Sequence, residues 1–226
     1  MNRMTVILAS QGLAAYLLQT IPDCVTRGVV VGHDARQHGE FFARLTATTI
    51  MNRGIKVWWF DTMVHTPLVP FAVQELGAAA GVMVTASHNP RADQGYKVYW
   101  ENACQIVSPI DKGIAQAMSL EVTPERNNWN LSLGLTPRLF NWIQWEEEIV
   151  KRYFARVCEY IDYPTEIDYK LPGHFVYTPL HGVGYKYLDQ LICKLTQRED
   201  CKSFSFLCAT CVSVWVVNVS SRHGRY

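Results

Sequence analysis

The sequence predicts an α/β protein with a mixed, mainly parallel sheet and flanking helices. Three short apolar runs, at 28–32, 55–60 and 81–84, are typical of strands buried on both faces. Two segments with helical patterns, 39–53 and 67–76, separate these runs. Because a helix commonly joins one parallel strand to the next, this alternation predicts helices packed on a parallel sheet.

The flanking segments add a helix and a fourth strand. A helix is predicted over 5–20, ending near Pro22, before the first apolar run. A strand is predicted over 95–100, where aromatic and β-branched residues gather. This strand follows the third one too closely for a helical crossover, so a long exposed loop is expected to join the two.

Two further helices are predicted later in the chain, over 110–120 and 141–161, with a polar connector at 121–140 between them. Apolar and aromatic residues recur at helical spacing in the second of these helices. Its residues Trp142 and Trp145 are expected to lie in a core rather than to stack on a sugar. After Pro172 the pattern changes, with a strand predicted over 174–178 and then a helix over about 184–195.

These elements divide the chain into three parts. Residues 1–165 are expected to form one α/β domain, and residues 166–197 the beginning of a second. The tail, 198–226, is rich in Ser, Cys and Val and does not continue the α/β rhythm. Its apolar part has the composition of a strand, but no further helix follows it, so we expect the tail to pack poorly.

Composition argues against a nucleic-acid or membrane partner. The 226 residues include 21 basic and 20 acidic side chains, and a net charge of +1 gives no long-range attraction to polyanions. The apolar residues near the N-terminus are interrupted by Gln11 and Gln19, and no apolar stretch reaches the roughly 20 residues that span a bilayer. Seven scattered cysteines suit a reducing compartment, and we interpret the Cys208–Cys211 spacing as coincidental. A cytoplasmic globular protein is expected.

The segment Thr85–Pro90, T-A-S-H-N-P, is the strongest candidate for a functional site. It follows the strand at 81–84, and ligands of open α/β folds bind where strands end. Its hydroxyl, imidazole and carboxamide groups stand side by side, and Lys97 supplies a cation nearby. From the residues alone, Ser87 is either part of an ordinary turn or a nucleophile that carries a transferred group. A hydrolase is disfavoured because the pattern G-x-S-x-G is absent.

A wider set of motifs resembles one family. The segment 81–90 resembles the active-site signature of the α-D-phosphohexomutase superfamily, whose serine is phosphorylated in the active enzyme. The segments 95–100, 105–109 and 181–184 resemble its eukaryotic phosphopentomutase and glucose 1,6-bisphosphate synthase branch. The similarity covers about 4–195 and implies the first domain of a phosphoglucomutase-type fold.

The resemblance implies phosphoryl transfer through a phosphoserine. Phosphorylated Ser87 would give its phosphoryl group to a hexose or pentose monophosphate and take the other phosphate back from the bisphosphate. Lys97 matches the family lysine that assists proton transfer, and His88 would contact the transferring group. The family also implies Mg²⁺, with the Ser87 phosphate as one ligand, and a sugar bisphosphate activator.

The remaining candidates surround this loop. Asn89 and Arg91 are expected to bind substrate phosphate. Arg36, in a D-x-R element, is expected to bind phosphate or to brace the serine loop, and the alternative is a surface salt bridge at a helix start. His65-Thr66-Pro67 resembles a family loop but also suits simple helix initiation. His181–Gly184 is either a phosphate cradle at a helix start or, as we prefer, a tight turn.

Other family motifs are not found in the sequence. It contains no D-G-D-type metal loop, sugar-discriminating loop or distal phosphate-binding loop, and the family's first, arginine-bearing strand is also missing. We therefore expect a shortened product with two possible functions. One is a phosphosugar mutase by family that is incomplete and inactive alone. The other is a non-catalytic fragment that binds sugar phosphate weakly or modulates a full-length relative.

Overall fold

A computed structural model describes residues 1–121, 123–131, 140–142, 146–160, 175–179, 182–196, 204–209 and 212–217. It divides into two compact units, Met1–Lys151 and Arg152–Tyr226, which are described separately. The first unit contains α1 (Arg3–Thr20), α2 (Cys24–Arg27), β1 (Val29–His33), α3 (Gly39–Asn52), β2 (Val57–Trp59), α4 (Leu68–Leu76), β3 (Ala80–Val84), β4 (Tyr96–Trp100), α5 (Ile110–Leu120), the 3₁₀ helix η1 (Arg126–Trp129) and β5 (Phe140–Trp142). Helix α6 (Glu146–Glu159) crosses the boundary, and the second unit contains β6 (Phe175–Tyr177), α7 (Gly184–Thr196), β7 (Phe204–Ala209) and β8 (Val212–Val217).

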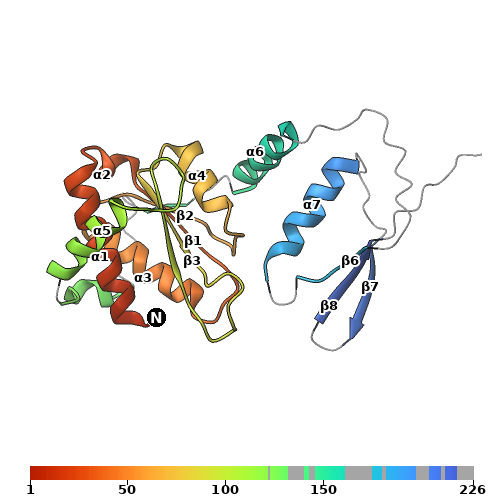
Figure 1. The fold of residues 1–226 in the computed structure, drawn as a ribbon, viewed down its shortest axis with the longest axis horizontal. Coiled ribbons are helices and arrows are strands. Elements are labelled where there is room, and N and C mark those ends of the chain that lie inside the picture. Colours follow the sequence, from red (N-terminus) through yellow and green to blue (C-terminus); the bar gives the residue numbers. More distant parts are fainter. Residues whose placement is uncertain are drawn as a thin grey trace, which may run out of the picture. The chain divides into compact units, whose positions relative to one another are not determined.

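The first unit is an α/β domain built on a five-stranded mixed sheet in the order β4-β3-β1-β2-β5 (Figure 1). Strand β1 pairs in parallel with β2 and β3, and β5 pairs in parallel with β2. Only β4 is antiparallel within this sheet, to β3. The predicted fold class is confirmed, and so is the exposed loop in place of a crossover between β3 and β4.

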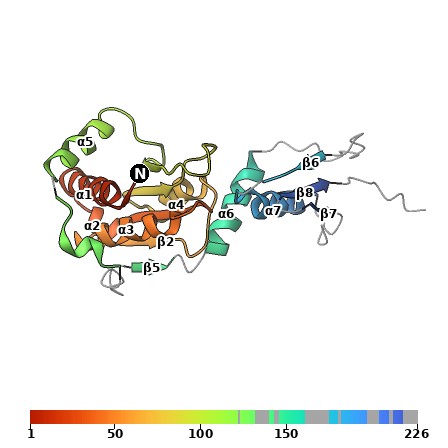
Figure 2. The ribbon, with the colours of Figure 1, turned by 90° about the horizontal axis from the view of Figure 1, so that it is seen from below.

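Helices cover both faces of this sheet. Val29 and Val31 of β1 lie in one apolar cluster with residues of α1 and α3. On the opposite face α4 lies so close that a Cβ atom at Gly81 would come within 2.6 Å of Val73, which explains a glycine within β3. Helix α1 lies between α5 and α3 (Figure 2). This packing buries β1 and β3 along their whole length, so the loops that follow their carboxyl ends start from a packed core.

One predicted element differs from the structure. The helix expected over 141–161 begins only at Glu146, and Phe140–Trp142 instead form β5. A three-residue strand is too short for its period to be seen in the sequence, and its partner β2 is distant along the chain. The core position expected for Trp142 and Trp145 lies outside the described side chains.

The second unit contains a three-stranded antiparallel sheet in the order β6-β8-β7. The predicted strand at 174–178 and the helix after it correspond to β6 and α7. The tail forms β7 and β8, two strands where the sequence favoured at most one. Both predicted domain boundaries, at 165 and 197, lie outside the described residues and stay predictions. Among the helices that the structure describes, none is long and apolar enough to cross a bilayer.

Poor packing of the tail can be tested by limited proteolysis. Although β7 and β8 are paired through their backbones, the segment lacks the apolar periodicity of the earlier elements. We expect a protease of broad specificity to remove residues beyond about 198 first and to leave roughly residues 1–160 intact, as judged by mass spectrometry. A tail as resistant to cleavage as the first unit would contradict this expectation.

Candidate active site

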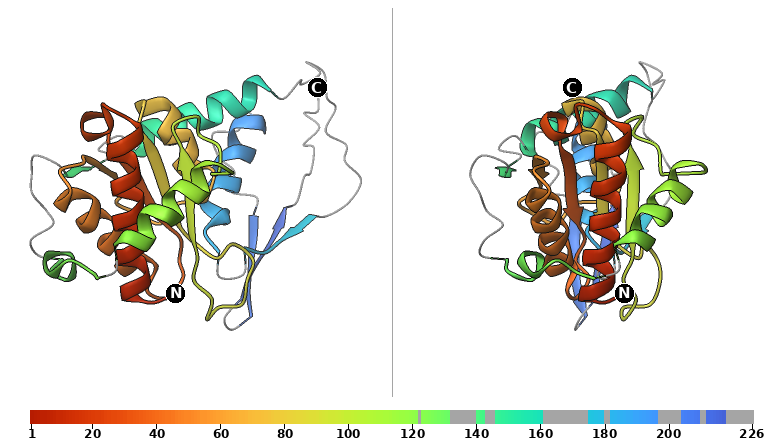
Figure 3. Two further views of the ribbon diagram at one scale, coloured as in Figure 1. Left: turned by 60° about the vertical axis from the view of Figure 1, so that its left-hand side comes forward. Right: turned by 90° about the vertical axis from the view of Figure 1, so that its left-hand side faces the viewer.

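The candidate site lies where the carboxyl ends of β1 and β3 meet. His33 and Val84 are register partners in the parallel pair, and the Asp34 N–H donates a hydrogen bond of 3.3 Å to the Val84 carbonyl. The residues that follow the two strands therefore come together, although they are far apart in the sequence. The loop from β3 to β4 projects past this edge of the sheet (Figure 3, left).

The serine loop is closed by a tight contact at its base. Thr85, only 2% exposed, donates its backbone N–H to the Gly95 carbonyl at 3.1 Å. A side chain at Gly95 would collide with the Thr85 carbonyl oxygen, so only glycine permits this approach. Everything between these two residues forms a compact projection with most of its residues exposed.

Ser87 has a conformation that is unusual for a residue with a side chain. Its φ angle of 54° lies in the left-handed region. Its backbone N–H donates to Thr85 Oγ1 at 2.9 Å, and its hydroxyl accepts a hydrogen bond of 2.7 Å from Lys97 Nζ. The predicted geometry is confirmed: Ser87 is exposed on the loop after β3, and Lys97 of β4 reaches its hydroxyl. Left-handed residues without glycine's freedom are strained and are often found at functional sites.

The guanidinium of Arg36 holds the same loop from the other side. Nη1 donates to the carbonyl oxygens of Pro90 and Asp93, at 2.8 and 3.0 Å. Nη2 donates to those of Ser87 and Asn89, at 2.9 and 2.7 Å. The side chain is 12% exposed, so the alternative of a solvated surface salt bridge does not describe it. Bracing of the serine loop is confirmed in its geometry, whereas phosphate binding by Arg36 stays a prediction.

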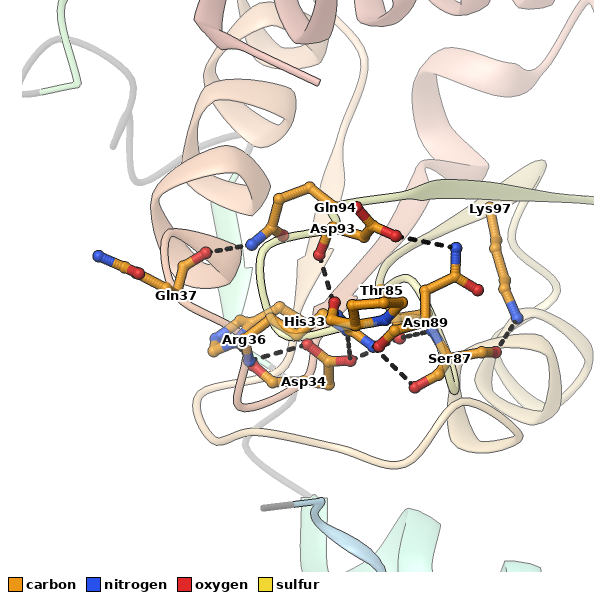
Figure 4. A network of polar contacts seen from close by, with 11 residues as sticks. His33, Asp34, Arg36, Gln37, Thr85, Ser87, Asn89, Asp93, Gln94 and Lys97 are labelled. Carbon is orange, nitrogen blue, oxygen red and sulfur yellow. Dashed lines mark hydrogen bonds and ion pairs between the residues drawn. The ribbon is translucent and has the colours of Figure 1, made fainter. Parts of the chain in front are cut away.

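Asp34 links Arg36 to Thr85, at the base of the serine loop (Figure 4). Its Oδ1 accepts the Arg36 backbone N–H at 3.0 Å, and its Oδ2 lies 3.5 Å from Arg36 Nε. Thr85 donates its hydroxyl proton to the same Oδ2. Sequence reasoning singled out the D-x-R element but missed this contact to Thr85. No local signal marks this contact, because it joins residues 51 positions apart.

The other predicted residues of the loop, His88, Asn89 and Arg91, have side chains that are exposed to solvent. His88 and Arg91 are exposed, and neither has a hydrogen-bond or ion-pair partner in the part of the chain that the structure describes. Asn89 is exposed, and its amide nitrogen donates to Asp93 Oδ2 at 3.3 Å. The structure does not bring the imidazole of His88 to the Ser87 hydroxyl. Such exposed groups are free to turn toward an anion that arrives at the loop.

Two more segments, 65–67 and 181–184, were predicted as possible parts of the site. Pro67 is the N-cap of α4, as the helix-initiation reading of His65-Thr66-Pro67 expects. Burial lowers the pKa of His65 to about 4, so its imidazole is neutral near pH 7. In the second segment His181 lies outside the described residues, while Gly182 lies in a turn and Gly184 begins α7.

The residues present do not make a complete metal site. Within the described ranges no group of three or more His, Cys, Asp or Glu side chains is arranged to hold a metal ion. The carboxylate of Asp34 is engaged by Thr85 and Arg36. On this loop, a phosphate on Ser87 and the carboxylate of Asp93 could offer oxygen ligands to Mg²⁺. These groups do not complete a site by themselves, so no step below is routed through the ion.

Comparison with known proteins identifies the family. Residues 1–123 match the family model described as phosphoglucomutase/phosphomannomutase, alpha/beta/alpha domain I. A solved structure of a putative phosphomannomutase from Thermus thermophilus aligns with a TM-score of 0.55 and 26% identity, over 72% of this chain and 33% of that chain. The chain belongs to the phosphoglucomutase/phosphomannomutase family, and the match falls on its first domain.

Curated relatives place the chain near one branch of this family. It is 48% identical over 203 residues to a probable phosphoribomutase of Schizosaccharomyces pombe, covering 88% of this chain and 34% of the relative. It is 42% identical to the phosphoribomutase of Saccharomyces cerevisiae, over 86% of this chain and 32% of the relative. The human phosphopentomutase is 40% identical, over 84% and 31%. The chain thus spans about a third of the length of these relatives.

Proposed function

We propose that this chain is the phosphoserine-bearing part of a phosphosugar mutase. Such an enzyme moves a phosphoryl group within a hexose or pentose monophosphate through a sugar bisphosphate. The observation that carries the proposal is the contact of 2.7 Å between Lys97 Nζ and the exposed Ser87 hydroxyl, on a loop fixed at the end of β3. The similarity to a phosphoribomutase, a phosphopentomutase and glucose 1,6-bisphosphate synthase supports it.

In the proposed reaction the phosphoryl group leaves Ser87 Oγ for a hydroxyl oxygen of the sugar phosphate. The bond from phosphorus to Oγ breaks, the bond to the sugar oxygen forms, and the sugar hydroxyl loses the proton that Oγ gains. Lys97 already donates to Oγ, so it is placed to supply a proton and positive charge to this oxygen as the bond breaks. The same cation offsets the charge of about −1.5 to −2 on phosphoserine.

The exposed residues of the loop complete the proposal. Arg91, Asn89 and His88 stand on the same projection as Ser87 and would contact the phosphate of the incoming sugar. Mg²⁺, when bound, would supply electrostatic stabilisation of the transferring group. A sugar bisphosphate would load Ser87 initially. The free thiols of Cys24, Cys104 and Cys158 support a reducing, cytoplasmic setting.

A domain replacement tests this function. Residues 1–123 would replace the corresponding segment of the Saccharomyces cerevisiae phosphoribomutase, which supplies the rest of an enzyme. We expect the chimera to retain phosphoribomutase activity. A chimera that folds, as shown by circular dichroism and thermal melting, but lacks activity would count against the proposal.

A second proposal concerns the polypeptide alone. We infer that these residues by themselves bind sugar phosphate without catalysis or modulate a full-length relative, because His88, Asn89 and Arg91 are exposed beside Ser87 and can meet an anion. Titration of the isolated chain with ribose 5-phosphate, followed by NMR signals of the serine loop, tests this second proposal. Saturable shifts of the loop signals would support binding by the chain alone, and unchanged signals would count against it.

A further inference from the structure

Ser87 is held at three of its atoms by three different residues. Its N–H donates to Thr85 Oγ1, its carbonyl oxygen accepts from Arg36 Nη2, and its hydroxyl accepts from Lys97 Nζ. Figure 4 shows Arg36 and Lys97 on opposite sides of the serine. Because left-handed backbone is disfavoured for a residue with a Cβ atom, such a conformation persists only where the surroundings enforce it.

The terminal N–H donors of Arg36 are all used in this arrangement. A guanidinium has five N–H donors in a rigid planar fork. The two terminal nitrogens of Arg36 donate to four backbone carbonyls of the serine loop, and Nε pairs with Asp34 Oδ2. A lysine at this position would keep the positive charge but could not reproduce the fork. The shape of the group is therefore what the loop requires.

Thr85 connects Asp34 to the backbone of Ser87 through two hydrogen bonds whose directions are determined. A hydroxyl has a single proton, and Thr85 gives it to the carboxylate of Asp34, which can only accept. The lone pairs of Thr85 Oγ1 then remain for the N–H of Ser87, at 2.9 Å. An apolar side chain of the same shape would fill the space but would leave the Ser87 N–H without this acceptor.

We propose that Asp34, Arg36 and Thr85 form a positioning unit that fixes the backbone of Ser87 so that its hydroxyl stays against Lys97. The unit acts on the carrier serine through backbone atoms and needs no contact with the substrate. Its importance for catalysis rests on the proposed function, but the positioning itself can be measured without any phosphoryl transfer.

The test measures the proximity of positions 87 and 97 directly. In the full chain, Ser87→Cys places a thiol beside the Lys97 amine, and o-phthalaldehyde forms a fluorescent isoindole only where it bridges a thiol and a primary amine. The signal is the initial rate of fluorescence gain, with the bridged peptide confirmed by mass spectrometry. The unchanged chain and Ser87→Cys combined with Lys97→Met supply the blanks.

Thr85→Val in the Ser87→Cys background is expected to lower this rate about tenfold or more, since small displacements greatly reduce effective concentration. Arg36→Lys is expected to do the same, because charge alone does not hold the carbonyls. Thr85→Ser keeps the hydroxyl, so its rate should equal that of the Ser87→Cys chain without a second substitution. Thr49→Val is the matched control: Thr49 is also buried, but its hydroxyl bonds to Leu45 within α3, so the rate should not change.

The proposal is overturned if Thr85→Val and Arg36→Lys leave the rate as it is while circular dichroism shows a folded chain. It is also overturned if the Ser87→Cys chain reacts no faster than the blanks, because the contact with Lys97 would then not persist in solution. Should Thr85→Val fail to fold, Arg36→Lys and Thr85→Ser decide the matter. An inactive domain-replacement chimera with a normal isoindole rate would refute the function and leave the positioning unit intact.

Discussion

Ser87→Ala in the domain-replacement chimera is expected to lower phosphoribomutase kcat by at least about 10⁴-fold, as loss of a covalent carrier does in other enzymes. The proposed reaction passes through a bond between Ser87 Oγ and phosphorus. Lys97 donates to this oxygen and Arg36 donates to the Ser87 carbonyl oxygen, and both are cations that do not carry phosphate stably. The measurement is steady-state kinetics with a coupled assay for the pentose phosphate product.

Ser119→Ala provides the matched control for this variant. Ser119 lies exposed on α5, and its hydroxyl donates only to the Gln116 carbonyl of its own helix. Its removal should leave kcat unchanged. If Ser87→Ala and Ser119→Ala behave alike, Ser87 is not the carrier and the assignment of the loop is wrong.

The isolated chain of 226 residues is expected to show no measurable interconversion of glucose 1-phosphate or ribose 1-phosphate with its isomer, even with Mg²⁺ and a bisphosphate activator. The described residues provide the carrier and Lys97, but they do not form a metal centre. Correct positioning of a reactant accounts for roughly 7–11 kcal/mol of a barrier. Loss of preorganised charge around the transferring group adds to that cost.

Contamination by the host's own mutase is the main risk in this measurement. Ser87→Ala of the same chain, purified in parallel, reveals it, because contaminating activity persists in that variant. Turnover by the unchanged chain that disappears in Ser87→Ala would show that this part of an enzyme suffices for catalysis. Catalysis would then need no groups beyond those of this chain.

Local patterns in the sequence predicted most of the first unit. Strands β1, β2 and β3 are buried apolar runs, and the segments between them have helical periodicity, so each element is marked by its own residues. Strand β5 was missed because only its pairing with β2, a contact distant in sequence, defines it as a strand. The hairpin of β7 and β8 depends in the same way on pairing within the second unit.

The candidate site was predicted in part. Ser87 and Lys97 stood out because they follow and begin adjacent strands, and a motif marks them. The contacts from Asp34 to Thr85 and from Arg36 to the loop carbonyls join residues 51 or more positions apart. Such contacts depend on the register between β1 and β3, which the sequence alone does not determine.

Mass spectrometry of the peptide that contains Ser87 tests the central claim most directly. The chimera would be incubated with Mg²⁺ and glucose 1,6-bisphosphate, quenched in acid and digested. We expect one phosphate on Ser87 and its loss when a sugar monophosphate is added before quenching. An active chimera that carries no phosphate on Ser87, or carries it on another residue, would contradict the account.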